Sequence, residues 1–468
     1  MTSKVDILKG SIVKNLLLFT LPIMLQGILQ TLYNAADLVI VGNLSKTDSA
    51  GEIALSAVGA TSSIFNVMTA LFMGIAVGVD VITSFNYGRE KYDKVKKTID
   101  TAVVSSIFLG LICAIMGIVI ARPVLVLMNT PDTVLDYAVT YLSILMIGVP
   151  FSLMFNFCSA VFRTAGQTNK PFIYLVIAGA LNVVLNILFV AGFDWGVVGV
   201  AIATVISQVV SCFLLLITLM KNKGLFTFNI HNIEFSWKIF GKMIAIGLPA
   251  GLQSSAFSLS NVFLQSGVNS FGTNGMAAGT AVNTYEGLMW VTLSSFSNAA
   301  TTFVSQNYGA ADMKRAKKAM KYSILITAGL GIILGLTMFL SGELLMKIFI
   351  HGNAEAMMYA RQRYMVTFPL YFLAGIMSML PGVIRGFGSS LPPSIISLVG
   401  ACGIRIVWVY TIFKLHHHMS ILFLVHPVTW IITNIALVIN LIIVYKKAKK
   451  KMEKWKPKTE SKELILQE

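Results

Sequence analysis

The chain has 468 residues, of which 56% are hydrophobic and only 12% are charged, and its mean hydropathy is +0.77. Soluble domains carry roughly 25% charged residues because charges cover their surface, so this composition excludes a soluble globular protein and a disordered chain. The formal net charge is +16, but the basic residues cluster in short connectors and near the C-terminus, which is typical of a membrane protein rather than of nucleic-acid binding.

Apolar runs of about 20 residues recur along the whole chain, which predicts an all-α polytopic membrane protein. A helix of that length crosses a hydrocarbon core of about 30 Å at a rise of 1.5 Å per residue. The twelve predicted transmembrane spans are 15–41, 54–84, 98–121, 134–161, 171–192, 196–220, 243–269, 276–304, 322–342, 357–384, 394–413 and 420–444.

The distribution of basic residues predicts how these spans are oriented. If the N-terminus is cytoplasmic, 29 of the 36 Lys and Arg residues fall in the two tails and the connectors on that side. Basic loops stay in the cytoplasm, so we expect both termini there, in a multi-pass protein of the cell membrane. The Lys-rich composition and compact loops suggest a bacterial source.

The four cysteines lie singly in apolar stretches and show no paired spacing. Cys113, Cys158, Cys212 and Cys402 are therefore expected to be buried apolar side chains rather than disulfides or metal ligands. We predict no cofactor, no metal site and no enzymatic activity.

An internal repeat divides the chain into two halves of six spans. The segment LPIMLQ from Leu21 matches LPAGLQ from Leu248, at an offset of 227 residues. The connectors NYGREKYDKVKK (86–97) and NYGAADMKRAKK (307–318) match at an offset of 221, and RTAGQTNKP (163–171) meets RGFGSSLPP (385–393) at 222. We therefore predict an amino lobe over 1–220, a cytoplasmic connector over 221–242, a carboxy lobe over 243–445 and a basic tail over 446–468.

Two parallel six-helix repeats predict a transporter. An even number of spans per repeat makes both halves enter the membrane in the same sense, and such repeats enclose a cavity at their interface. A channel would more often show a filter motif in shorter subunits. A receptor or scaffold would need a soluble sensing domain, and the connector over 221–242 is too short for one.

The same motifs resemble those of the multidrug and toxic compound extrusion (MATE) transporters. The resemblance rests on the LPIMLQ opening, the two NYG connectors, RTAGQT and the stretch LNVVLNILFVAGFDWGVVGVAIATVISQ, and it covers essentially the whole chain. It implies a monomeric, two-lobed exporter of small, mostly cationic or amphiphilic compounds that takes up Na⁺ or H⁺ in exchange. A flippase for a lipid-linked or other amphiphilic substrate, from the same wider superfamily, is the alternative.

Polar residues form a stripe along one face of the first predicted span. Gln30, Asn34 and Asp37 follow one another at helical spacing, and a carboxylate inside a membrane span is a functional candidate by default. A solvated position at the outer helix end is the competing interpretation of Asp37. The resemblance to the MATE family makes Asp37 the ion-coupling residue of the amino lobe.

Three asparagines extend the candidate site of the amino lobe. Asn182 and Asn186 lie one turn apart in span five, and Asn156 in span four is a similar candidate. Many MATE proteins carry Asp where this chain has Asn186, so a proton site with two carboxylates is in doubt here. Neutral ligands for sodium or substrate and hydrogen bonds that pack helices are both open interpretations.

The predicted carboxy lobe has its own polar candidates, namely Gln253, Asn261, Asn283, Glu286 and Arg405. Glu286 and Arg405 lie at similar predicted depths in spans eight and eleven. An unpaired Arg at that depth is costly, so we predict that these two residues form an ion pair.

Three further charged residues are expected near the cytoplasmic interface. Asp80 is interpreted as a capping or solvated residue. Arg163 and Arg385 occupy equivalent positions in the two repeats, and both are expected to extend toward the lipid headgroups.

Overall fold

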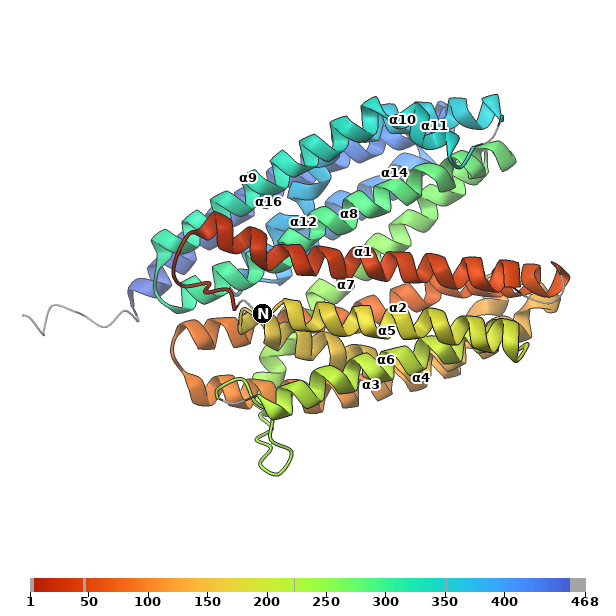
Figure 1. Cartoon of the computed structure of the whole chain (residues 1–468). Helices are drawn as coiled ribbons and strands as arrows, with labels where there is room; N and C mark the ends of the chain where they lie inside the picture. Colours follow the sequence, from red (N-terminus) through yellow and green to blue (C-terminus); the bar gives the residue numbers. More distant parts are fainter. Residues whose placement is uncertain (1–3, 45–47, 223, 351, 455–468) are drawn as a thin grey trace, which may run out of the picture.

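Long helices account for nearly all of the structure, a computed structural model that describes residues 4–44, 48–222, 224–350 and 352–454 (Figure 1). The helices of the first repeat are α1 (Ile12–Leu44), α2 (Asp48–Gly88), α3 (Tyr92–Leu127), α4 (Asp132–Thr164), α5 (Asn169–Ile187), the π-helical η1 (Leu188–Gly192) and α6 (Gly196–Lys221). Those of the second are α7 (Trp237–Asn269), α8 (Gly272–Gly309), α9 (Met313–Leu340), α10 (Gly342–Lys347), α11 (Ala354–Thr367), α12 (Tyr371–Gly386), α13 (Leu391–Ser397), the π-helical η2 (Leu398–Gly403), α14 (Ile404–Tyr410), α15 (Ile412–Leu415) and α16 (Met419–Glu453).

Most of the predicted spans are single helices that can cross a membrane. Nine helical segments of the described chain are long and apolar enough to do so, if α5 with η1 and α13 through α15 each count as one segment, and the bent pair α11 and α12 gives a tenth. The remaining two spans are α7 and α8, with 33 and 38 residues, which are long enough but carry more polar side chains. Residues 455–468 of the predicted basic tail lie outside the described residues.

Two predicted spans are not continuous helices. Span ten is broken into α11 and α12, which meet at 54°, and Pro369 lies at the break. Proline lacks the amide hydrogen that a continuous helix needs and clashes with the preceding turn. Span eleven passes through the π-helical η2 between α13 and α14, and span five likewise ends in η1, so the fifth span of each repeat departs from α-helical geometry.

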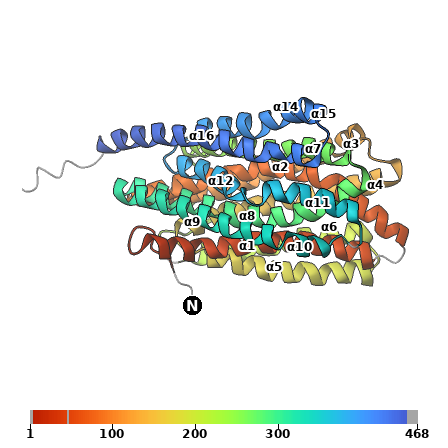
Figure 2. The ribbon, with the colours of Figure 1, turned by 90° about the horizontal axis from the view of Figure 1, so that it is seen from above.

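The buried apolar residues form two large clusters, one on each side of the molecule. The first runs from Ile40 to Met243, and the second combines residues of α8 to α16 with the start of α1, including Leu16 and Phe19. The two helix bundles lie close together at the end that carries the N-terminus and diverge toward the end that carries α10 and α11 (Figure 1). Seen from above, the long helices run along one common direction (Figure 2).

Helices α1 and α7, the first helices of the two repeats, pass from one bundle to the other. The start of α1 packs in the second cluster, whereas Ile40 near its end belongs to the first. Helix α7 begins in the first cluster at Met243 and ends in the other bundle (Figure 1). Its contact with α2 is close, because a Cβ atom on Gly74 would lie 2.2 Å from the backbone nitrogen of Gly251. The two bundles are therefore joined by helices that belong to both.

Candidate functional site

Asp37 lies at the centre of a polar cluster in the first bundle. Asn186 Nδ2 donates a hydrogen bond to Asp37 Oδ1 at 2.5 Å, and Thr204 Oγ1 donates to Asp37 Oδ2 at 3.4 Å. Asn182 contacts both neighbours, donating to Thr204 at 3.4 Å and accepting from Asn186 at 3.3 Å. The structure thus brings together Asp37, Asn182 and Asn186 from α1 and α5, and it adds Thr204 from α6.

The chemistry of this cluster suits a small cation or a proton. Asp37 is only 8% exposed and Asn186 is fully buried. The hydrogen bonds recorded for the Asp37 carboxylate come from a neutral amide and a hydroxyl, and Asn186 Oδ1 has no hydrogen-bond partner among the described residues. A buried carboxylate is costly without a compensating positive charge. The cluster therefore offers one formal charge and several neutral oxygen ligands.

The other candidates of the amino lobe do not join this cluster. Gln30 and Asn34 are exposed on α1, and within the described part of the chain no hydrogen bond connects them to Asp37. Asn156 donates to the carbonyl oxygen of Ser152, one turn earlier in α4, at 2.8 Å. That bond lies within α4, so it neither brings Asn156 to Asp37 nor connects two helices.

In the second bundle, Glu286 pairs with Arg363 and not with Arg405. Arg363 Nη2 lies 2.7 Å from Glu286 Oε2, and Thr367 Oγ1 donates to Glu286 Oε1 at 2.8 Å. The predicted pair of Glu286 with Arg405 is therefore wrong. Glu286 on α8 faces α11, and Arg405 on α14 instead donates to Asn261 Oδ1 at 3.4 Å.

The two remaining candidates of this lobe each accept a bond from a buried arginine. Asn283 accepts from Arg363, and Gln253 accepts from Arg385. Arg385 also donates to Ser394 and is only 7% exposed. The expectation that Arg385 reaches the headgroups is thus wrong, because its guanidinium is held between α7 and α13.

A cavity of about 660 Å³ opens next to the Glu286 pair. We call it the carboxy-lobe cavity. It is lined mainly by residues of α7, α8, α11, α12, α14 and α16, with a few from α2, and its wall includes Asn261, Asn283, Glu286, Arg363 and Arg405. Aromatic side chains cover much of the remaining wall, namely Phe257, Trp290, Tyr371, Phe423 and Trp430.

Comparison with known proteins identifies the family of the chain. The family model MatE matches residues 22–188 and 249–411, which is more than half of the chain and covers both repeats. The chain belongs to the MATE family. The probable multidrug resistance protein YoeA of Bacillus subtilis (strain 168) is 24% identical to this MATE protein over 444 residues, with 93% of each chain covered.

Solved structures show the same fold. The outward-facing conformation of a multidrug resistance MATE family transporter of the MOP superfamily matches this MATE chain with a TM-score of 0.87 at 21% identity, covering 96% of this chain and 99% of that one. A second match is a MOP superfamily transporter from Pyrococcus furiosus Vc1 (DSM3638), which is described as having a binding pocket of reverse polarity. Its TM-score is 0.83 at 21% identity, and the match covers 97% of this chain and 98% of that one. The predicted MATE fold of twelve transmembrane helices is confirmed.

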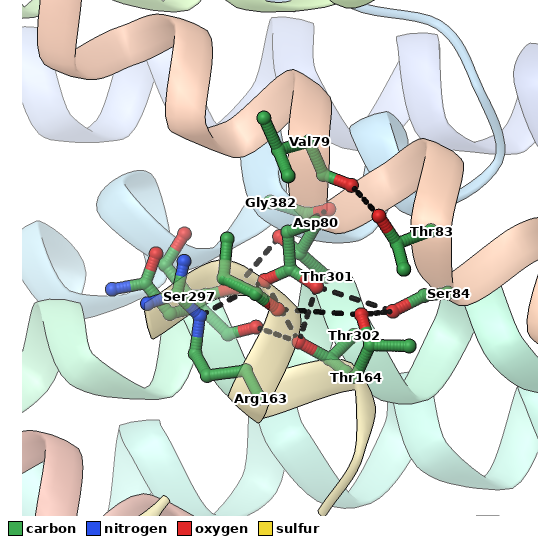
Figure 3. Close-up of polar contacts among 12 residues, drawn as sticks. Val79, Asp80, Thr83, Ser84, Arg163, Thr164, Ser297, Thr301, Thr302 and Gly382 are labelled. Carbon is green, nitrogen blue, oxygen red and sulfur yellow. Dashed lines mark hydrogen bonds and ion pairs between the residues drawn. The ribbon is translucent and has the colours of Figure 1, made fainter. Parts of the chain in front are cut away.

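A third polar cluster of this MATE protein joins the two bundles at the end where they lie close together (Figure 3). Asp80 of α2 is 1% exposed, and Arg163 Nε of α4 lies 3.1 Å from its Oδ2. From the other bundle, Thr302 of α8 donates to both carboxylate oxygens at 3.0 and 2.9 Å. The expectations of a solvated Asp80 and a headgroup-facing Arg163 are wrong, because the two side chains compensate each other inside the protein.

Neighbouring side chains extend this cluster, which we call the inter-bundle seam. Ser305 of α8 donates to the carbonyl oxygen of Val81 at 2.8 Å, and Gln306 donates to that of Thr164 at 2.7 Å. The seam therefore consists of Asp80, Arg163 and the α8 residues Thr302, Ser305 and Gln306, and it connects α8 to both α2 and α4.

Proposed function

We propose that this protein is a secondary active antiporter that exports small organic compounds, such as drugs or toxic metabolites, in exchange for Na⁺ or H⁺. The observation that carries the proposal is the buried Asp37 carboxylate, whose recorded hydrogen bonds come only from neutral donors. Membership of the MATE family and the naming of the similar Bacillus subtilis protein as a probable multidrug resistance protein support export as the direction of transport.

The position of α1 relates an event at Asp37 to the arrangement of the bundles. When Na⁺ or H⁺ neutralises the carboxylate, the bonds from Asn186 and Thr204 lose roughly half of their strength. Helix α1 then packs differently against α5 and α6. Because the start of α1 belongs to the second cluster, such a shift favours a different arrangement of the two bundles. Antiport requires that the ion and the substrate stabilise different arrangements.

The orientation and the substrate charge complete the proposal. With both termini in the cytoplasm of a cell-membrane monomer, the diverging ends of the bundles in Figure 1 face outward. The expected cationic character of the substrate stays a prediction. The Glu286 carboxylate on the cavity wall is paired with Arg363, and one structurally similar transporter is described as having a pocket of reverse polarity, so the fold alone does not fix the substrate charge.

Transport by the purified full chain in liposomes tests this proposal. Liposomes with an imposed Na⁺ gradient, an imposed pH gradient or neither are given a panel of fluorescent organic compounds of both charges. We expect gradient-driven transport of at least one compound, and a loss of at least tenfold in Asp37→Asn. Asp136→Asn is the matched control, because Asp136 is an exposed carboxylate paired with Arg122. The proposal is contradicted if the transport rate is the same with and without the Na⁺ and pH gradients, or if Asp37→Asn transports as fast as the control variant.

A further inference from the structure

The wall of the carboxy-lobe cavity carries an excess of positive charge. Its Asp, Glu, Lys and Arg residues are Arg363, Arg405 and Glu286, and the other titratable lining residues are His426 and Tyr371. Two arginines against one glutamate leave one positive charge when His426 is neutral. A cavity built to hold an organic cation would have the opposite balance.

Arg405 is the source of this excess. Its side chain is only 5% exposed, its one recorded hydrogen bond is the 3.4 Å contact with Asn261, and its Nε atom has no partner among the described residues. Within the described residues no ion pair joins Arg405 to Glu286, and both Glu286 carboxylate oxygens are bonded to Arg363 and Thr367. A buried guanidinium with so few partners is costly, and an anionic ligand would relieve that cost.

The other buried arginines of this lobe are held in a different way. Arg363 bonds to Gly279, Asn283 and Glu286, and its guanidinium lies 3.9 Å from the centre of the Phe423 ring. Arg385 is outside the cavity and bonds to two side chains. The Nε atoms of all three arginines lack a partner among the described residues. The difference is that Arg363 and Arg385 each bond to two side chains, whereas Arg405 lines the cavity with one long hydrogen bond.

We propose that Arg405 binds the anionic group, a carboxylate or a phosphate, of an amphiphilic organic substrate in the carboxy-lobe cavity. A guanidinium matches the two oxygens of such a group through paired hydrogen bonds. Phe257 and Trp290, whose ring centres are 6.1 Å apart on the cavity wall, supply a surface for the apolar part of the same molecule. The inference rests on the proposed function, because it takes this cavity as the place where the exported compound binds.

Binding to the full chain in detergent micelles tests the inference without any gradient. The probe is a naphthyl-alkyl carboxylate, compared with its carboxamide and its trimethylammonium analogue, and the dissociation constants are measured by calorimetry. We expect the carboxylate to bind at least tenfold more tightly than either analogue. Arg405→Gln should remove that preference, and Arg405→Lys should keep part of it, because lysine retains the charge without the paired geometry.

Two further variants separate charge recognition from loss of structure. Glu286→Gln removes the negative charge from the wall but also leaves Arg363 unpaired and lowers stability, so its dissociation constants are referred to the folded fraction. In that fraction carboxylate binding should tighten severalfold, whereas at a cation site the substitution would weaken cation binding. Arg405→Gln removes a poorly compensated buried charge and should leave the melting temperature of the unliganded protein unchanged or higher. Arg122→Gln, which removes an exposed arginine outside the cavity, should bind as the wild type does.

The source of the anion is resolved by repeating the measurement in nanodiscs. If phosphatidylglycerol in phosphatidylcholine nanodiscs stabilises the wild type but not Arg405→Gln, the anionic group is a lipid headgroup, and recognition by Arg405 still holds. Equal binding of carboxylate and carboxamide without a lipid effect, tightest binding of the trimethylammonium compound, or an unaffected Arg405→Gln would each overturn the inference. Tight carboxylate binding without gradient-driven transport would instead contradict only the antiport proposal.

Discussion

At the scale of single residues, Glu286 and Arg363 form a buried ion pair within the second bundle, and each has further partners. Their side chains are 12% and 4% exposed. Thr367 donates a hydrogen bond to the other oxygen of the Glu286 carboxylate. The Arg363 guanidinium donates to the carbonyl oxygen of Gly279 and lies over the face of the Phe423 ring. Such a pair contributes little net stability when intact, but removing one partner leaves an uncompensated charge in a medium of low dielectric constant.

A double-mutant cycle on this pair should show strong coupling. We expect Glu286→Gln and Arg363→Gln each to lower the free energy of unfolding by about 3–5 kcal/mol. The double variant should lose much less than the sum, because no unpaired charge remains. The measurement is the unfolding of purified protein in detergent. The parallel cycle of Glu286→Gln with Arg405→Gln should be closer to additive, and stronger coupling there than with Arg363 would restore the pairing predicted from sequence.

Which of these residues are recognisable from sequence depends on their chemistry. Asp37, Asn182 and Asn186 are conspicuous because amides and carboxylates are rare in apolar spans. Thr204 carries no such signal, since threonines in helices commonly bond to their own backbone. Arg363 lies inside a predicted span, but its pairing with Glu286 depends on how α11 is placed after the break at Pro369, and helical periodicity contains no information on that angle.

At the scale of helices, both copies of the repeated Asn-Tyr-Gly motif lie at a close approach of α2 and α8. A Cβ atom on Gly88 would lie 2.0 Å from the carbonyl oxygen of Gln306, and one on Gly309 would lie 2.3 Å from that of Phe85. Real Cβ atoms do not come so near to backbone oxygens. The two copies of the motif therefore let two helix backbones touch where the bundles meet.

Adding one methyl group at Gly88 should therefore separate these helices. We expect Gly88→Ala to lower the stability of the protein by about 1–3 kcal/mol, the usual cost of overpacking, and to lower its melting temperature in detergent. Gly59→Ala, in the same helix, is the matched control, because a Cβ atom there meets nothing within 4 Å. Alanine should stabilise that position by up to about 1 kcal/mol. Equal melting temperatures of the two variants would contradict this role of the motif.

The number and order of the transmembrane spans could be predicted from the lengths of the apolar runs, and the internal repeat could be predicted from the matching motifs. The breaks could not. Spans ten and eleven have the composition of ordinary transmembrane helices, yet one bends by 54° and the other contains a π-helical segment. Pro369 marks the bend, but Pro22, Pro150 and Pro249 lie inside continuous helices, so a proline alone does not predict which span breaks. The π-helical segment is stabilised by packing against neighbouring helices, which the composition of one span does not contain.

At the scale of the whole molecule, the bundles are held together at one end and separated at the other. The inter-bundle seam joins α2 and α4 to α8 at the closed end (Figure 3). The N-terminal segment is a second connection between the bundles, because it is hydrogen-bonded to both. In one bundle, the amide of Val5 donates to the carbonyl oxygen of Gly166. Arg315 of the other bundle donates to the carbonyl oxygens of Ile7 and Gly10. Opening this end requires the bonds of the seam to break, together with at least one of the two attachments of the N-terminal segment.

Two adjacent threonines of α8 allow the seam to be tested against a matched control. Thr302 Oγ1 bonds across the bundles to Asp80, whereas Thr301 Oγ1 bonds within its own bundle to the carbonyl oxygen of Gly382 at 3.0 Å. Both also bond to their own helix. Valine has nearly the same shape as threonine without the hydroxyl, so each substitution removes one hydroxyl from a buried site.

Thr302→Val should weaken the seam, because the buried Asp80 carboxylate loses a donor to both oxygens, at a cost of about 1–3 kcal/mol. We expect amide hydrogen exchange in residues 79–85 of α2 to accelerate about tenfold or more, since 1.4 kcal/mol corresponds to a factor of ten. Thr301→Val should leave that segment unchanged and accelerate exchange near Gly382 in α12 instead. If the two variants accelerate exchange equally in both segments, Thr302 is not a specific contact between the bundles, and the closed end is held by apolar packing alone.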